Sequence, residues 1–376
     1  MLIRAKHFVT REPLEILMRD GRIMWIRPVG RVPGPVDLEG PWVAPALFDL
    51  QINGAMGIGF NSPDLTVDRI RTVCAVCRSH GIGGMLPTLV TTAPQAIDRA
   101  LAALELARET HPDLARMIPG YHIEGPWISP HDGPRGAHPR EHVALPDLDQ
   151  FRRWQEIAGG RIRLLTLAPE LAGAVPLIEA VAGTGVVVAI GHTEASPETI
   201  REAIAAGAKL STHLGNGSRA MLPRHPNHLW EQLAADELRA SVISDGHHLP
   251  ASVLKVFVRA KSLERLIVTC DASPLAGLPP GVYPTFDGSH EVLADGRVIV
   301  PGTTYLAGSG QFTDHCVSEM MRTTGIGLEE AIALATIRPC ELLGLPIPEV
   351  AAGKTNPLMV FDWREGEPIR IVAVTP

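Results

Sequence analysis

The sequence lacks the features that mark secreted, membrane-spanning and nucleic-acid-binding proteins. It has only five cysteines, an odd count, so we expect no disulfide framework, and we interpret Cys74 and Cys77 as buried helix positions. The longest apolar runs, such as residues 186–190, are far shorter than the roughly 20 residues that a membrane-spanning helix needs. Lys and Arg are scattered and the net charge is −7, so no basic stripe is available for nucleic acid. The first residues show no secretion signal, and we expect a cytoplasmic protein.

What the chain has is the length and composition of a large globular protein. Its 376 residues can hold one large α/β domain and a small accessory module, and an apolar fraction of 45% provides a sizeable core. Glycine and proline, at 36 and 33 residues, indicate many tight connections between elements.

Both ends of the chain are predicted to form strands. Residues 2–44 show short strands with turns at Asp20-Gly21 and at residues 32–35, and residues 357–374 form a strand pair around Glu365-Gly366. Because two β segments flank a long middle, we expect one small β module made of residues 1–44 and 353–376.

The middle of the chain, residues 45–352, alternates apolar strands with amphipathic helices. Helical periodicity is present at residues 66–80, 94–110, 197–207 and 251–263. The eight predicted strands are residues 42–48, 83–89, 117–123, 162–167, 186–190, 208–212, 240–244 and 266–270. Eight such units in succession favour a closed (β/α)8 barrel of the TIM type over a doubly wound sheet. After the eighth strand we expect an inserted β segment at residues 281–305 and helices at 312–324 and 328–343.

Four polar residues follow four of these apolar runs: Glu124, His192, His213 and Asp271. The carboxyl ends of barrel strands meet at one rim, so we expect these side chains to converge. A buried glutamate is costly unless it is paired or binds a metal, and one carboxylate with two imidazoles leaves a coordination position open for water. Taken singly, the glutamate could form an ion pair, each histidine could be a core residue, and Asp271 could cap a turn. As a set, they predict a hydrolytic metal site.

Segments along nearly the whole chain resemble one known family. The matching segments are PALFDLQINGAMGIGF, YHIEGPWISP, GAHP, APE, GHTEAS, STHLGN, SDGHHLP, VTCDASPLAG and LAGSG. They resemble the N-acetylglucosamine-6-phosphate deacetylase family of the amidohydrolase superfamily. The resemblance implies a (β/α)8 barrel with a small β-sandwich built from both termini. It also implies a homodimer that hydrolyses the acetamide of N-acetylglucosamine 6-phosphate to glucosamine 6-phosphate and acetate.

The resemblance also implies roles for single residues. Glu124, His192 and His213 would hold the metal ion. Asp271 would take the proton of the attacking water and return it to the leaving nitrogen, since an amide anion is not expelled. His138, the histidine of GAHP, would polarise the acetyl carbonyl.

Recognition of the sugar phosphate is implied at four further positions. His248 in SDGHHLP matches the residue that contacts the sugar hydroxyls. Asn216 and Gly217 stand where an Asn-Ala pair of the family binds the 6-phosphate of the substrate through its backbone amides. Arg224 matches an arginine that binds the 6-phosphate of the substrate held by the partner subunit.

The number of metal ions is predicted from the segment after the first barrel strand. Many amidohydrolases carry His-x-His there for a second metal, whereas this chain has Gln51 and Asn53. Amides are poor substitutes for imidazole, so we expect vacant second-metal positions and one divalent ion. We expect zinc, and iron, manganese or cobalt would also suit the ligands.

Two other functions stay open at this point. The chain could be a related amidohydrolase that acts on another N-acyl compound or a cyclic amide. It could also be a non-catalytic scaffold descended from an amidohydrolase, although loss of ligands would mark such a protein, and all four residues are present.

Overall fold

Asp20 and Gly21 close a β-hairpin near the start of the chain. Both have positive φ angles, 51° and 74°, as a two-residue turn between antiparallel strands requires. They join β2 (Pro13–Arg19) to β3 (Arg22–Pro28) in antiparallel register. The computed structural model describes residues 1–30 and 35–376, so the turn expected at residues 32–35 falls mostly outside the described residues.

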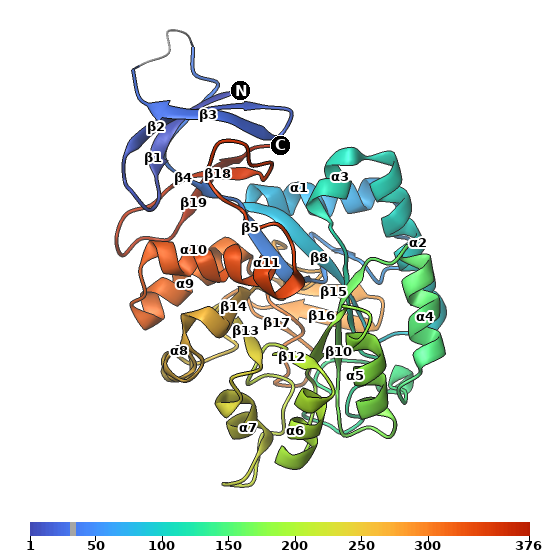
Figure 1. Cartoon of the computed structure of the whole chain (residues 1–376). Helices are drawn as coiled ribbons and strands as arrows, with labels where there is room; N and C mark the ends of the chain where they lie inside the picture. Colours follow the sequence, from blue (N-terminus) through green and yellow to red (C-terminus); the bar gives the residue numbers. More distant parts are fainter. Residues whose placement is uncertain (31–34) are drawn as a thin grey trace.

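Strands from both ends of the chain form a separate six-stranded sheet, and both termini lie beside it (Figure 1). Its strand order is β19-β18-β4-β1-β2-β3, with β1 (Leu2–His7), β4 (Leu38–Pro45), β18 (Leu358–Asp362) and β19 (Arg370–Val374). Buried aliphatic side chains such as Ile3, Ile16 and Val360 form its core. The expected small β domain built from both termini is therefore confirmed, and its strands form one six-stranded sheet. The domain boundaries at residues 44 and 353 stay a prediction.

Eight parallel strands form the barrel. They are β5 (Leu47–Ile52), β8 (Ile82–Val90), β9 (Tyr121–Glu124), β10 (Ile162–Leu167), β11 (Val187–Ile190), β12 (Ala208–Ser211), β13 (Arg239–Ile243) and β14 (Leu266–Thr269). Each strand pairs with the next along this series, and a parallel bridge between Ile52 and Ala272 brings the first and last strands together. The expected (β/α)8 fold is confirmed.

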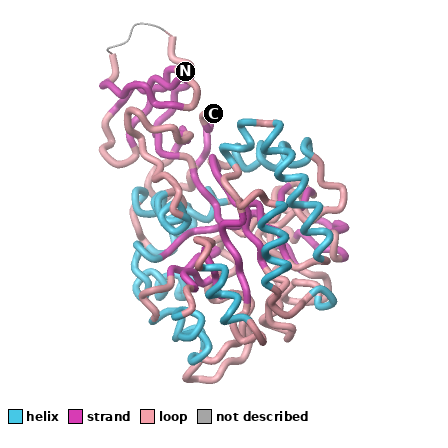
Figure 2. The backbone as a smooth tube through the Cα atoms, turned by 45° about the vertical axis from the view of Figure 1, so that its right-hand side comes forward, coloured by secondary structure: helices cyan, strands magenta, loops and turns pink. Residues whose placement is uncertain are grey.

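Helices lie along the outside of the barrel strands (Figure 2). They are α1 (Val67–Ser79), α2 (Pro94–Thr110), α3 (Pro112–Met117), α4 (Leu148–Ile157), α5 (Ala174–Ala182), α6 (Pro197–Ala205), α7 (His228–Ala234), α8 (Ala251–Arg265), α9 (Thr313–Thr324), α10 (Leu328–Leu334) and α11 (Ile337–Leu343). Several begin at side-chain caps: Thr66 accepts from the backbone N–H of Arg69 before α1, and Ser196 accepts from that of Thr199 before α6.

Three of the predicted strands and helices differ from the structure by more than two residues at one end or are divided in two. The apolar run at residues 42–48 spans two strands, because β4 ends at Pro45 in the terminal sheet and the barrel begins with β5. The strand predicted at 117–123 starts only at Tyr121, since Met117 still belongs to α3. The helix predicted at 328–343 is split into α10 and α11, and Pro339, which has no N–H to donate to the carbonyl of residue 335, explains the break.

The inserted segment after the eighth strand forms a small antiparallel sheet, as expected. It consists of β15 (Gly281–Thr285), β16 (Gly288–Val292) and β17 (Val298–Ile299). Val292 and Val298 of this sheet lie in a small buried cluster against which Ala137 packs. The insertion thus contacts the loop that carries His138.

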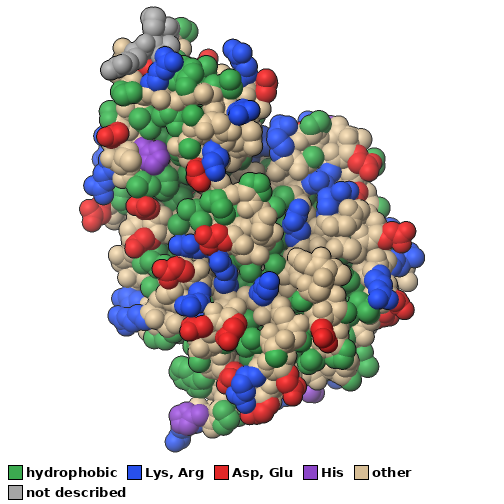
Figure 3. Space-filling model, viewed as in Figure 1, with side chains coloured by type: hydrophobic (Ala, Val, Ile, Leu, Met, Phe, Trp, Pro, Cys, Tyr) green, Lys and Arg blue, Asp and Glu red, His purple; other side chains and the backbone are tan. Residues whose placement is uncertain are grey.

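The cysteines, the helices and the surface charges can be compared with what the composition indicated. All five cysteines are free and buried, including Cys74 and Cys77 on α1. In the part of the chain that the structure describes, no helix has the length and apolar character needed to span a bilayer. On the face shown in Figure 3, basic and acidic side chains are interspersed. The expected cytoplasmic location stays a prediction.

Candidate metal centre

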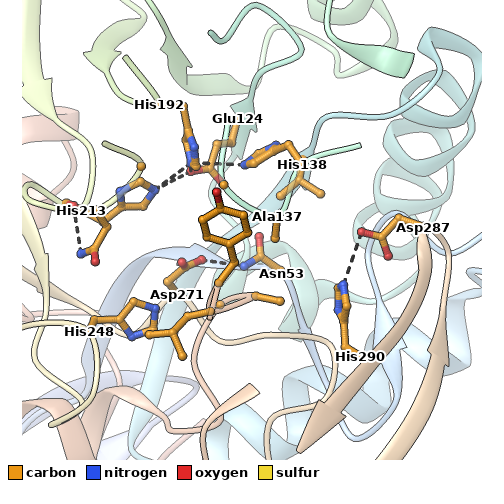
Figure 4. A pocket seen from close by; sticks show the side chains of 18 of the residues that line it. Asn53, Glu124, Ala137, His138, His192, His213, His248, Asp271, Asp287 and His290 are labelled. Atoms are coloured by element: carbon orange, nitrogen blue, oxygen red, sulfur yellow. Dashed lines mark hydrogen bonds and ion pairs between the residues drawn. The ribbon is translucent and has the colours of Figure 1, made fainter. Parts of the chain in front are cut away.

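Four barrel strands deliver the four candidate residues to one cavity. Glu124 is the last residue of β9, while His192, His213 and Asp271 each follow the end of a strand by two residues. All four are buried and line a cavity of about 320 Å³. Figure 4 shows their side chains pointing toward one another.

The backbone at this rim is strained. His192, His213 and Asp271 have φ angles of 51°, 31° and 52°, a region that side chains other than glycine rarely adopt. Such strain persists only where the surrounding structure enforces it, and it is concentrated at functional sites. Three such residues at neighbouring strand ends mark this rim as the functional end of the barrel.

The side chains of Glu124, His192 and His213 form a compact set of possible metal ligands. One atom from each lies within 4.8 Å of the others. Nε2 of His213 is 2.9 Å from Oε1 of Glu124, and Nε2 of His192 is 3.3 Å from the same oxygen. The two Nε2 atoms are 3.1 Å apart.

The hydrogen bonding of His192 shows that these atoms fit a cation. Its Nδ1 lies 2.8 Å from the backbone carbonyl of Pro134, which can only accept, so Nδ1 carries the proton. In the neutral ring, the Nε2 lone pair then points at the carboxylate of Glu124, so two acceptors face each other. A divalent metal ion would satisfy both, and a histidine that binds a metal through one ring nitrogen usually donates the other N–H to a carbonyl or carboxylate, as His192 does to Pro134.

The pKa values of the two carboxylates move in opposite directions. Burial would raise the pKa of Glu124, but the neighbouring imidazoles of His192 and His213 hold this pKa well below its usual value. Burial, followed by the negative charge of Glu124, raises the pKa of Asp271 to about 7. Two carboxyl groups whose pKa values diverge in this way are suited to different roles.

Gln51 and Asn53 donate hydrogen bonds to the two carboxylates. Nε2 of Gln51 is 3.0 Å from both oxygens of Glu124 and from Oδ1 of Asp271, and Nδ2 of Asn53 is 2.7 Å from that Oδ1. The two amide side chains therefore act here as hydrogen-bond donors to carboxylates.

His138 lies next to the three possible ligands. Its Nε2 is 3.2 Å from Nε2 of His192, and its Nδ1 is 2.8 Å from Oγ1 of Thr91. Burial, followed by the charge of His192, lowers the pKa of His138 to about 3, so the ring is neutral near pH 7.

Most residues expected to bind substrate also line the cavity. His248, Asn216 and Gly217 do so, and Nδ1 of His248 is 2.8 Å from Asp245. Gly217 has a φ of 56°, and a Cβ atom there would lie 2.9 Å from Nδ1 of His192, so glycine suits this position better than alanine. Arg224 is exposed and lies outside the cavity lining.

Sequence reasoning assigned no role to several residues around the cavity. Asp245 orients His248, and its place three residues before that histidine was an available signal. Asp287 and His290 enter the cavity wall from the inserted sheet and face each other at 3.7 Å (Figure 4). No periodic or spacing signal connects them to the distant strand ends.

Together, the parallel barrel and its buried carboxylate–histidine set define a metal-dependent hydrolase. Residues 42–374 match the sequence model of the Amidohydrolase family. The N-acetylglucosamine-6-phosphate deacetylase of Bos taurus is 35% identical over 321 residues, which cover 82% of this chain and 76% of the relative. The chain belongs to the N-acetylglucosamine-6-phosphate deacetylase family of amidohydrolases.

Two further similarities extend over the full length. The N-acetylgalactosamine-6-phosphate deacetylase of Escherichia coli O157:H7 is 30% identical, covering 96% of this chain and 95% of that protein. A mutant N-acetyl-D-glucosamine-6-phosphate deacetylase from Mycobacterium smegmatis, solved in complex with N-acetyl-D-glucosamine-6-phosphate, has a TM-score of 0.86 and 29% identity. The structural alignment covers 100% of this chain and 97% of the Mycobacterium smegmatis chain. The family resemblance deduced from the sequence motifs is thus confirmed.

Proposed function

We propose that the protein is a metal-dependent deacetylase that hydrolyses N-acetylglucosamine 6-phosphate to glucosamine 6-phosphate and acetate. The observation that carries the proposal is the convergence of Glu124, His192 and His213 with Asp271 on a single cavity. The deacetylase relatives, at 28–35% identity, point to the same reaction.

Glu124, His192 and His213 would hold one divalent ion. When bound, such an ion supplies Lewis acidity and makes water a nucleophile near neutral pH. Zinc suits two imidazoles and a carboxylate, and iron, manganese or cobalt are the alternatives. The hydrogen bonds that Gln51 and Asn53 donate to Glu124 and Asp271 support a single ion.

Asp271 is the proton carrier in this proposal. As a carboxylate it takes a proton from the attacking water, and it then returns that proton to the leaving nitrogen. Its raised pKa, about 7, suits both steps near neutral pH. His138 donates a hydrogen bond from Nε2 to the acetyl oxygen and stabilises the charge that develops there.

The phosphate site is proposed to be shared between two subunits. Among the residues that the structure describes, no lysine or arginine lines the cavity, so one chain supplies Asn216 and Gly217 but no cationic side chain. Arg224 is exposed beside Trp230, whose side chain is 56% exposed, and Met221 nearby is 87% exposed. Exposed apolar residues around an arginine are consistent with a homodimer in which each Arg224 serves the opposite cavity.

N-acetylgalactosamine 6-phosphate is a second candidate substrate. The deacetylase named for this sugar matches almost the full length of the chain. The two sugars differ only in the orientation of one hydroxyl, so the residues at the sugar end of the cavity decide between them.

Acetate release from four sugars tests the proposal. The substrates are N-acetylglucosamine and N-acetylgalactosamine, each with and without the 6-phosphate, and the metal content of the protein is measured in parallel. We expect the highest kcat/KM with N-acetylglucosamine 6-phosphate. Turnover confined to the unphosphorylated sugars would overturn the phosphate assignment, and no acetate from any of them would overturn the proposed function.

A further inference from the structure

We propose that Thr91 is a positioning residue that fixes the tautomer of His138, so that Nε2 of His138 carries the proton. The role of this N–H in catalysis rests on the proposed function, in which it donates to the acetyl oxygen of the substrate. The proton assignment itself follows from the contacts of three side chains.

Thr91 lies directly after β8, on the barrel rim, and is fully buried. Its Oγ1 is 2.8 Å from Nδ1 of His138, which belongs to a loop without regular secondary structure. The backbone leaves little room for Thr91 to shift, because Gly125 faces it so closely that a Cβ there would lie 2.2 Å from Oγ1. Thr91, at the end of a barrel strand, thus holds the ring of His138 in a defined orientation.

The proton positions follow from a chain of contacts that starts at His192. Nδ1 of His192 donates to the carbonyl of Pro134, so its Nε2 is unprotonated in the neutral ring that binds a metal. Nε2 of His138 lies 3.2 Å from that Nε2, and two lone pairs at this distance would repel. Nε2 of His138 therefore carries the proton, its Nδ1 is an acceptor, and the hydroxyl of Thr91 is the donor.

The tautomer decides what His138 can do. A ring with an unprotonated Nε2 this close to His192 could act as a further metal ligand, whereas a protonated Nε2 cannot bind a metal. By donating to Nδ1, Thr91 keeps His138 out of the ligand set. Once a metal ion takes the lone pair of His192, the N–H of His138 is free to donate to the substrate oxygen.

Kinetics of matched variants test the role of Thr91. Thr91→Val removes the hydroxyl and keeps the shape, and we expect it to lower kcat by about tenfold or more while zinc content and KM change little. Thr91→Ser restores the donor and should recover most of kcat. Thr92→Val makes the same change at the adjacent buried threonine and should leave kcat unchanged. Wild-type kcat in Thr91→Val, or no recovery in Thr91→Ser, would overturn the proposal.

Nitrogen NMR of the zinc-loaded full chain tests the tautomer without any substrate. With 15N-labelled histidine, and with His138→Gln to assign the signals, wild-type His138 should show a protonated Nε2 and an unprotonated Nδ1. Thr91→Val should lose this single tautomer. A protonated Nδ1 in the wild type would contradict the inference even if the enzyme is active. If the enzyme releases no acetate, the proposed function fails, and the NMR result still decides the tautomer.

Discussion

At the scale of single residues, environment gives two nearby carboxyl groups different chemistry. The neighbouring imidazoles of His192 and His213 hold the pKa of Glu124 low, so it stays an anion, as a metal ligand must. Burial and the charge of Glu124 raise the pKa of Asp271, so it can gain and lose a proton near neutral pH. Strand-end position and the neighbouring motif predicted both residues from sequence. Thr91, which contacts His138, and Asp245, which contacts His248, were not predicted, because a lone Thr or Asp after a strand has many structural uses.

Asp271→Asn should separate proton transfer from metal binding. The amide keeps the shape of the side chain but cannot take up a proton, so we expect kcat to fall by roughly 10²- to 10⁴-fold. Metal content, measured on the same sample, should stay near the wild-type value. Asp295→Asn, at an exposed turn of the inserted sheet, is the control and should be fully active. A fully active Asp271→Asn would remove Asp271 from the mechanism.

His192→Ala should lower the metal content. The substitution removes one of three ligands and leaves Glu124 facing fewer compensating groups. Metal analysis after dialysis should give a metal-to-protein ratio well below that of wild type, with circular dichroism showing that the fold is retained. His225→Ala, on an exposed loop, provides the comparison. An unchanged ratio would count against a ligand role for His192.

At the scale of elements, the strand ends are predictable and the insertions between them are not. The apolar runs before Glu124, His192 and Asp271 identify barrel strands, and parallel strands end at one rim. The inserted sheet β15–β17 was expected as β structure, yet its contact with the cavity depends on three-dimensional packing. Thr285, Asp287 and His290 therefore enter the site without a sequence signal.

Asp287→Ala should weaken substrate binding through the inserted sheet. Asp287 accepts a 2.6 Å hydrogen bond from Thr285 and presents its other oxygen toward His290 in the cavity wall. A hydrogen bond from a sugar hydroxyl to such a carboxylate is worth roughly 1.5–3 kcal/mol, so KM should rise about tenfold or more with little change in kcat. Glu291→Ala on the adjacent strand β16 is the control. An unchanged KM would exclude Asp287 from substrate contact.

Lys261 on α8 gives a prediction about stability and pH. Its Nζ donates to the carbonyls of Ala235 and Leu238, and burial lowers its pKa to about 8 from the usual 10.5. Between these values the unfolded chain binds more protons than the folded one, so this residue's contribution to stability increases with pH and is lost as pH falls from about 10.5 to 8.

Urea unfolding of Lys261→Met at several pH values tests this effect. The difference in unfolding free energy, wild type minus variant, should rise between about pH 8 and 10.5 and be constant below pH 8. Lys255→Met, at an exposed position of the same helix, should show no such trend. A difference that does not vary with pH would contradict the pKa of Lys261.

At the scale of the whole molecule, the two ends of the chain share one sheet while the middle forms the barrel. Strands expected at residues 2–44 and 357–374 predicted a common module, because these two β segments flank a long middle of alternating strands and helices. The division of residues 42–48 between β4 and β5 was not predicted, since the apolar run is continuous from Trp42 to Phe48. The role proposed for Arg224 involves a second subunit, which no pattern within one chain describes.

The central claim is that one metal ion on Glu124, His192 and His213 makes this chain a deacetylase. The most direct measurement is acetate release from N-acetylglucosamine 6-phosphate by the full-length protein, first stripped with a chelator and then titrated with zinc. The account predicts that activity is lost on stripping and returns linearly until one equivalent of zinc per chain is bound. Full activity in the stripped protein, or a linear rise that ends only at two equivalents, would contradict it.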